Sequence, residues 1–182
     1  MNEKQWKLLL ALRAGNRIRR FHTEPMAQEE TVGHHTAGVL GLLTSIYYPA
    51  FPPSHLMVYA LMHDTGEQWT GDVPANAKWL NPDLKEVLDA TEIAGYKANG
   101  LAMPVIDAEL QGELKFCDSM DCVLKCTEEL AQGNTNALHI LARLLPYTMQ
   151  AAKAVETERG AACLTLYGIV AERFNQQVKR DE

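Results

Sequence analysis

The sequence has little that supports a membrane protein, a secreted protein or a β-sheet protein. No helix-like segment contains an apolar run close to the roughly 18 residues that span a bilayer. Residues 1–6 contain no apolar signal core, and Val, Ile and Thr never alternate with polar residues as they do in strands. The sequence therefore predicts a cytoplasmic protein with no membrane partner.

Cysteine is scarce, and its spacing does not indicate a disulfide framework. The four cysteines include no CxxC pair, and three of them lie within ten residues of one expected helix. We expect reduced thiols in the core of a cytoplasmic protein, with a cysteine-based zinc site as the open alternative. The cysteines are Cys117, Cys122, Cys126 and Cys163.

Positive charge is also in short supply. Lys and Arg total 17 and Asp and Glu total 23, which gives a formal net charge of −6. That excess of acid argues against nucleic acid or an anionic membrane as the main partner. Hydrophobic residues make up 47% and charged residues 22% of the 182 positions, which is typical of one globular domain spanning residues 1–182.

The sequence does contain helical periodicity between breaks at Pro and Gly. Apolar residues recur every three or four positions, and Ser54 and Asn134 are suited to begin helices as N-caps. The pattern predicts an all-α, single-domain helical bundle. The expected helices span residues 3–14, 31–47, 54–64, 82–99, 105–132, 134–150 and 153–177.

Four polar residues lie on apolar faces of these helices. His35 has apolar residues at i+4, i+7 and i+11, which places it on an inward stripe. His63 and Asp64 end another apolar helix, and a buried carboxylate there needs a cation or hydrogen-bond donors. Asp118 lies between apolar neighbours at i−4 and i+4. Two imidazoles and two carboxylates directed at one core suit a divalent transition metal with open water positions.

Each of the four also has a purely structural interpretation. His35 could be a hydrogen-bonded core residue, and His63 could form an ion pair with Asp64, although adjacent helical residues point in different directions. Asp118 could pair with Lys115 at i−3.

Two neighbouring residues are interpreted differently. Asp121 has Lys125 at i+4 and is expected to form a solvated pair with it. His34 shares a face with Gly38 and Gly41, so that face would let another helix or a ligand approach closely.

The arrangement of His35, the His63-Asp64 pair and Asp118 resembles that of the HD-domain metal-dependent phosphohydrolases. The words VGHHT, HDTGEQWTGDVP and the segment from FCD to AQGN look like motifs of the bacterial HD-domain 5′-deoxynucleotidases. The similarity runs from about residue 19 to residue 134, which is most of the chain.

The short length and the Arg20-Phe21 pair, fifteen residues before His35, also resemble the small phage dATP triphosphohydrolases. Those enzymes accompany the replacement of adenine by diaminopurine in phage DNA. The resemblance implies the host cytoplasm if the chain is phage-encoded, and a homo-oligomer such as a dimer or a hexamer.

The resemblance implies roles for the motif residues. His35, His63, Asp64 and Asp118 match the metal ligands, and the metal could be Co, Mn, Zn, Fe or Mg. Glu67 matches the acid that protonates the leaving ester oxygen.

Some further positions match the family, and others depart from it. Asp72 matches the carboxylate that orients the attacking water or binds the sugar, and Arg20 matches the phosphate-binding arginine. Phe21 stands where the family usually has a tryptophan beside the base, and Asn76 stands where a proline is frequent. His34 replaces a glutamate of the nucleotidases.

Basic residues near the motifs suit a polyphosphate. Arg19 and Arg20 follow Arg13 and Arg17 within eight positions, and Lys78 lies near the Asp72 loop. Arginine forks suit phosphate oxygens, and the alternative is a solvated end of the first helix.

The sequence therefore predicts a metal-dependent deoxynucleotide phosphohydrolase, with a small-molecule deoxynucleotide as its partner. The favoured reaction is dATP to deoxyadenosine and triphosphate, which would shape the dNTP pool during phage replication. The first alternative is a 5′-deoxynucleotidase that converts dNMP to deoxynucleoside and phosphate. The second is an inactive HD module that binds nucleotides.

Overall fold

The computed structural model describes residues 1–178 of the chain, with side chains up to residue 174. Helices dominate these residues, so the prediction of an all-α bundle is confirmed. The assignment of residues 1–182 to one domain stays a prediction. The elements are α1 (Glu3–Gly15), β1 (Arg19–Arg20), β2 (Glu30–Thr31), α2 (Val32–Tyr47), α3 (Ser54–Met62), α4 (Glu67–Thr70), α5 (Ala75–Leu80), α6 (Pro82–Ala98), α7 (Ala108–Ala131), the 3-10 helix η1 (Thr135–Ala137), α8 (Leu138–Lys153) and α9 (Gly160–Val178).

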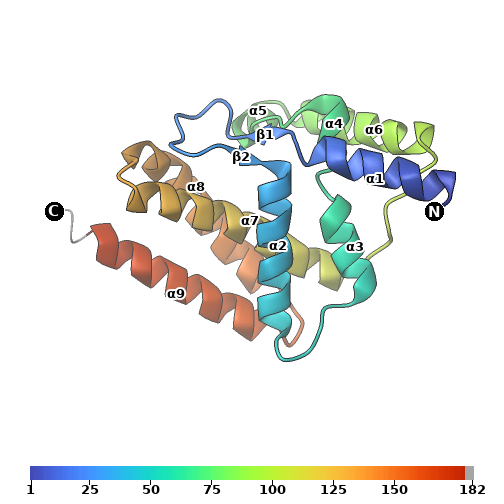
Figure 1. Cartoon of the computed structure of the whole chain (residues 1–182). Coiled ribbons are helices and arrows are strands. Elements are labelled where there is room, and N and C mark those ends of the chain that lie inside the picture. The colour runs from blue at the N-terminus through green and yellow to red at the C-terminus, as the bar shows by residue number, and fades with distance from the viewer. Residues whose placement is uncertain (179–182) are drawn as a thin grey trace.

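The long helix α7 organises the larger core. It packs against α2, α8 and α9, and α8 also packs against α9 (Figure 1). Phe116, Met120 and Val123 of α7 are fully buried against Val39 and Leu43 of α2. Large apolar side chains at helical spacing therefore fix α2 and α7 against one another, and these helices carry two of the predicted metal ligands, His35 and Asp118.

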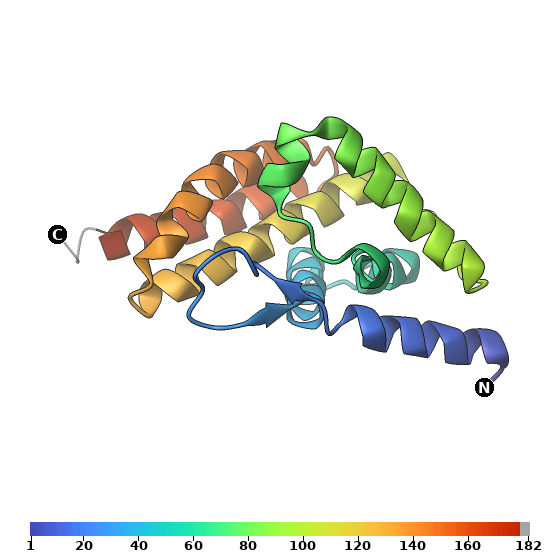
Figure 2. The same cartoon turned by 90° about the horizontal axis from the view of Figure 1, so that it is seen from above.

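A second group of helices lies across one end of this bundle. Figure 1 shows α1, α4, α5 and α6 together along the top, and Figure 2 shows the β1–β2 loop extending away from α1 toward α7 and α8. Trp69 meets Tyr96 edge-on, with 5.1 Å between ring centroids. A side chain at Gly95 would overlap the Trp69 ring, so this glycine lets α6 approach α4.

Several boundaries differ from the sequence-based expectation. The short helices α4 and α5 and the two-residue strands were not predicted, because segments this short carry too few residues to show a period. Ser54 is the first residue of α3 rather than its N-cap, a position that Pro53 occupies without a side-chain hydrogen bond. Asn134 does cap η1, where its side chain accepts a hydrogen bond from the Asn136 N–H.

The cysteines and the apolar character of the helices also bear on the sequence-based predictions. All four cysteines are buried and free, so the prediction of reduced core thiols is confirmed. No cysteine belongs to a candidate metal cluster within the part of the chain that the structure describes. No described helix combines the length and apolarity that crossing a bilayer requires.

Candidate metal and nucleotide site

A cavity of about 490 Å³ opens between the start of the β1–β2 loop, the segment that follows α4, and helices α7 and α8. Most residues that the sequence placed in a substrate site line it. They are Arg20, Phe21, Asp64, Glu67, Asp72, Asn76, Lys78 and Asp118.

Two histidines and two aspartates converge beside this cavity, which Asp64 and Asp118 line and His35 and His63 do not. Ligand atoms of His35, His63 and Asp118 all lie within 4.8 Å of one another. Asp64 joins them, with Oδ2 3.6 Å from His35 Nε2 and Oδ1 3.4 Å from His63 Nε2. The structure thus brings together the four residues predicted to bind metal, in a mixed nitrogen and oxygen set that suits a divalent transition metal.

Local structure orients His63 for such a role. His63 follows the last turn of α3, and its Nδ1 lies 2.6 Å from the Ala60 carbonyl oxygen, which accepts a hydrogen bond from it. That bond leaves Nε2 as the free lone pair. Nε2 is buried and has no hydrogen-bond partner among the described residues. A buried acceptor without a donor fits a metal ligand.

His35 and Asp118 shift each other's pKa through the hydrogen bond that joins them. Burial alone would lower the pKa of His35, but hydrogen bonds to Asp118 and Asp121 outweigh it and raise this pKa to about 9. Burial of Asp118 acts against ionisation, yet the same hydrogen bond with His35 holds the Asp118 pKa well below its usual range. The predicted alternative of an Asp118–Lys115 pair is not what the structure shows, because Lys115 Nζ lies over the Tyr147 ring.

Arg20 is the cation closest to this cluster. Its Nη1 donates to Asp64 Oδ2 at 2.6 Å, and its Nε lies 3.6 Å from Glu30 Oε1. The Arg20 side chain is only 12% exposed. Burial alone would lower its pKa, but the thiol of Cys122 and the carboxyl groups of Asp64 and its neighbours raise the Arg20 pKa well above its usual value.

Glu67 and Asp72 lie on the wall beside the cluster. Glu67 is buried, and its Oε2 has no hydrogen-bond partner among the described residues. Burial and the charges of Asp64 and Asp72 raise the pKa of Glu67 to about 8, so it carries a proton at neutral pH. Asp72 lies beyond Gly71, whose φ of 75° permits the turn out of α4.

Aromatic and basic side chains complete the cavity. Phe21, which lines the cavity, has a φ of 52°, a left-handed conformation that costs free energy in a bulky residue. Sequence reasoning missed Trp79, Lys85 and Arg143, which also line it. Trp79 directly follows the predicted Lys78 and Lys85 lies in the first turn of α6, but Arg143 lies on α8, beyond any recognised motif.

The arginine cluster divides in the structure. Arg20 lines the cavity, whereas Arg13 and Arg17 are exposed on α1 and its C-terminal turn. Arg19 Nη2 pairs with Glu29 at 2.6 Å on the surface and does not line the cavity. The predicted substrate contact of Arg19 therefore finds no support in its position.

Asp121 is the residue that sequence analysis misjudged. It does not form a solvated pair with Lys125, because its Oδ2 accepts from His35 Nδ1 at 2.7 Å and its side chain is 15% exposed. Lys125 instead donates to Glu129 at 2.8 Å. The available signal was Gly38, which shares a helix face with His34 and lies directly against the Asp121 carboxylate.

A helical bundle that gathers two histidines and two aspartates at one cavity has the architecture of an HD-type phosphohydrolase domain. Residues 7–115, more than half of the chain, match the family model described as 5′-deoxynucleotidase YfbR-like. The chain belongs to this YfbR-like family.

Curated relatives agree with that assignment. A 5′-deoxynucleotidase of Vibrio atlanticus is 30% identical over 96 residues, 45% of this chain and 50% of the relative. The 5′-deoxynucleotidase YfbR of Salmonella arizonae is 35% identical over 94 residues, 44% of this chain and 47% of the relative. The chain thus matches about half the length of these relatives. A 5′-deoxynucleotidase of Erwinia tasmaniensis is 28% identical over 142 residues, 70% of this chain and 72% of the relative.

One solved structure shares the fold across nearly the whole chain. It is the cyanophage S-2L HD phosphohydrolase DatZ, determined with dA and one catalytic Zn²⁺ ion. The TM-score is 0.68 at 20% sequence identity, and the match covers 94% of this chain and 96% of that one.

Proposed function

We propose that this chain is a metal-dependent phosphohydrolase of deoxynucleotides and that its substrate is dATP, cleaved to deoxyadenosine and triphosphate. The single observation that carries the proposal is the cluster at the nucleotide-sized cavity. There the buried, unpartnered Nε2 of His63 lies within 4.8 Å of ligand atoms of His35 and Asp118.

His35, His63, Asp64 and Asp118 would hold the metal. A divalent metal there supplies Lewis-acid chemistry, because it withdraws charge from a phosphate oxygen and makes water more acidic. The relative with bound dA carries a catalytic Zn²⁺, and the nitrogen and oxygen donors here are compatible with that ion.

The surrounding side chains would do the rest of the chemistry. Arg20 holds phosphate oxygens and neutralises their charge. Glu67, protonated because burial raises its pKa to about 8, gives its proton to the departing 5′-oxygen. Asp72 orients the attacking water or binds the sugar.

The base and the remaining phosphates need separate contacts. Phe21 and Asn76 line the cavity, and the Phe21 ring would stack on a purine base. Lys78 and Arg143 line the same cavity, as does Lys85, which also pairs with Asp89. Together with Arg20 these cations exceed what a single phosphate needs, which favours a triphosphate.

Monophosphate hydrolysis is the second candidate, because the curated relatives are 5′-deoxynucleotidases. Phosphorus NMR of products from each dNTP and dNMP, with Zn²⁺, Co²⁺, Mn²⁺ or Mg²⁺, separates the two. Inorganic triphosphate from dATP is the expected result. Orthophosphate from dAMP with inert dATP would instead establish the second candidate, and inert substrates with every metal would indicate an inactive nucleotide-binding module.

A further inference from the structure

His35 has a carboxylate against each nitrogen of its ring. Nε2 lies 2.9 Å from Asp118 Oδ1, on the side of the proposed metal. Nδ1 lies 2.7 Å from Asp121 Oδ2, on the other side. His35 itself is 1% exposed, so the directions of both nitrogens are set by these partners and by helix packing.

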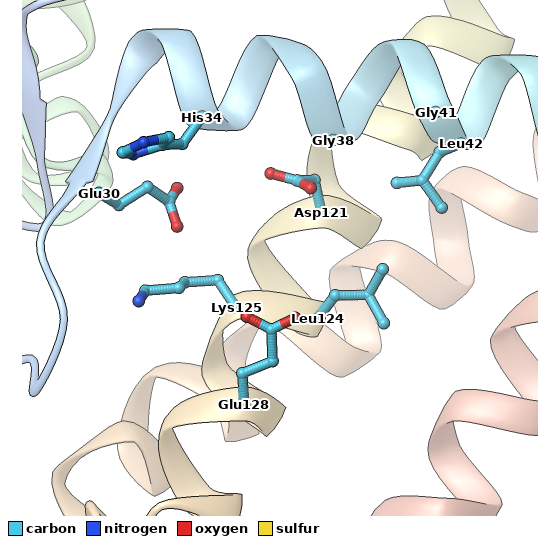
Figure 3. Close-up of a pocket in the computed structure, with 9 residues that line it drawn as sticks. All are labelled: Glu30, His34, Gly38, Gly41, Leu42, Asp121, Leu124, Lys125 and Glu128. Atoms are coloured by element: carbon cyan, nitrogen blue, oxygen red, sulfur yellow. The ribbon is translucent and has the colours of Figure 1, made fainter.

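Asp121 belongs to a different cavity from the one that would take the nucleotide. A second cavity of about 430 Å³ lies between α2 and α7, and Asp121 lines it with Glu30, His34 and Glu128 (Figure 3). Asp121 does not line the first cavity. Its carboxylate therefore cannot serve the substrate directly, and its contact with the site runs through His35.

Gly38 makes the close approach of Asp121 possible. Figure 3 shows the Asp121 carboxylate lying against α2 at Gly38. A Cβ atom at position 38 would overlap Asp121 Oδ1, so any side chain there would displace the carboxylate from His35. Gly38 on α2 and Asp121 on α7 therefore fit against one another where the two helices pack.

We propose that Asp121 is a positioning residue, which accepts the Nδ1–H of His35 and thereby directs His35 Nε2 to the metal. A neutral imidazole has one N–H, and a carboxylate at Nδ1 keeps that proton there, which leaves the Nε2 lone pair for the ligand bond. The same hydrogen bond fixes the orientation of the imidazole ring and makes Nε2 a stronger ligand for the metal.

The competing interpretation is a second cation site. Ligand atoms of Glu30, His35 and Asp121 also lie within 4.8 Å of one another. Glu30, however, lies 3.6 Å from Arg20 Nε, and the facing oxygen of Asp121 is already taken by His35. The Arg20–Glu30 contact and the His35–Asp121 hydrogen bond therefore account for this cluster without a second ion.

The test measures metal affinity rather than turnover. Co²⁺ is titrated into Asp121→Ala, Asp121→Asn and the parent protein, with far-UV circular dichroism to check the fold. We expect Asp121→Ala to weaken binding about 10–100-fold and Asp121→Asn, which keeps an acceptor oxygen, to weaken it less. Glu128→Ala, which lines the same cavity without touching His35, should stay within about twofold of the parent.

A second readout separates positioning from general destabilisation. In Zn²⁺-loaded parent protein, ¹⁵N NMR should show a neutral His35 ring protonated at Nδ1, and Asp121→Ala should lose that preference. Formate, which fits the space opened beside the second cavity, should restore Co²⁺ affinity to Asp121→Ala and should leave Asp121→Asn unchanged.

The inference rests on the metal-binding part of the proposed function, and the outcomes keep the two apart. A parent protein that binds no Co²⁺ would overturn the proposed function together with this inference. Parent and folded Asp121→Ala that bind Co²⁺ equally would overturn the inference alone. Loss of a second equivalent of Co²⁺, with the first unaffected, would also overturn it in favour of a cation held by Glu30 and Asp121.

Discussion

Arg20 Nη1 donates a 2.6 Å hydrogen bond to Asp64 Oδ2, so a phosphate-binding candidate and a metal-ligand candidate share one contact. The guanidinium also lies near Glu30. In the absence of a metal, Arg20 is therefore the cation that compensates two carboxylates in a largely desolvated place.

Arg20→Ala should destabilise the metal-free protein strongly. Removing one partner of a buried ion pair leaves an uncompensated charge, which costs about 3–5 kcal/mol. Urea unfolding measures the loss. Arg19→Ala is the matched control, since Arg19 pairs with Glu29 on the surface with 62% of its side chain exposed, and it should change stability little. Equal effects from the two variants would contradict the buried pairing.

His63→Ala should abolish the stabilisation that metal gives the protein. A ligand that binds the folded state at 100 times its Kd adds about 2.7 kcal/mol, which raises Tm. Thermal unfolding with and without Zn²⁺ measures this shift. His55→Ala, an exposed position on the same helix α3, should retain the whole shift. A His63→Ala protein with an undiminished shift would place the metal elsewhere.

Glu67→Gln should lower kcat about 10²–10⁴-fold, because glutamine cannot give a proton to the leaving oxygen. Metal affinity should change little, since Glu67 belongs to none of the ligand clusters found among the described residues. Glu92→Gln is the control: Glu92 is half-buried nearby and accepts from Thr70 without lining the cavity. Steady-state kinetics with chelator-based metal titration separates the two effects, and an unchanged kcat in Glu67→Gln would remove its role as acid.

Glu129→Gln should flatten the dependence of stability on acid. Burial disfavours ionisation of Glu129, but hydrogen bonds from Lys125, Asn134 and the backbone of Ala27 and Gln28 outweigh burial and lower its pKa to about 2. A depressed folded-state pKa contributes stability above the unfolded value of about 4.3 that is lost as pH falls toward 2.

Urea unfolding between pH 5 and 2.5 tests this, with the exposed neighbour substituted as Glu128→Gln for control. The parent and the control should lose stability more steeply than Glu129→Gln across that window. Parallel curves for all three proteins would show that the Glu129 carboxylate is not held ionised by its partners.

The helices were predictable because their apolar periodicity is long and regular. The segment 31–47 carries its inward stripe over four turns, and α2 occupies 32–47. The segment that follows Asp64 offered no such period. α4 has four residues and α5 six, and the position of α4 depends on contacts with α1 and α6 that are distant in sequence.

The site was predictable where a polar residue interrupts an apolar stripe. His35 and Asp118 were found in that way, and the structure places His35 Nε2 2.9 Å from Asp118 Oδ1. Asp121 was missed because Lys125 at i+4 offered a plausible solvated partner. Only the packing of α2 on α7 shows that Gly38 leaves room for the Asp121 carboxylate to reach His35. Arg143 was missed because a cavity wall from α8 has no local signature.

The anchoring of the β1–β2 loop has a consequence for how this chain can change. Glu129 on α7 accepts hydrogen bonds from the backbone N–H groups of Ala27 and Gln28, and the same helix carries Asp118 eleven positions earlier. Eleven residues make about three helical turns, so both side chains project on the same side of the rod. Inserting one residue between them would rotate the loop anchor by about 100° relative to the aspartate. A change in the length of this stretch would therefore separate the loop anchor from the metal site, whereas a substitution at an exposed position such as Glu128 leaves that relation intact.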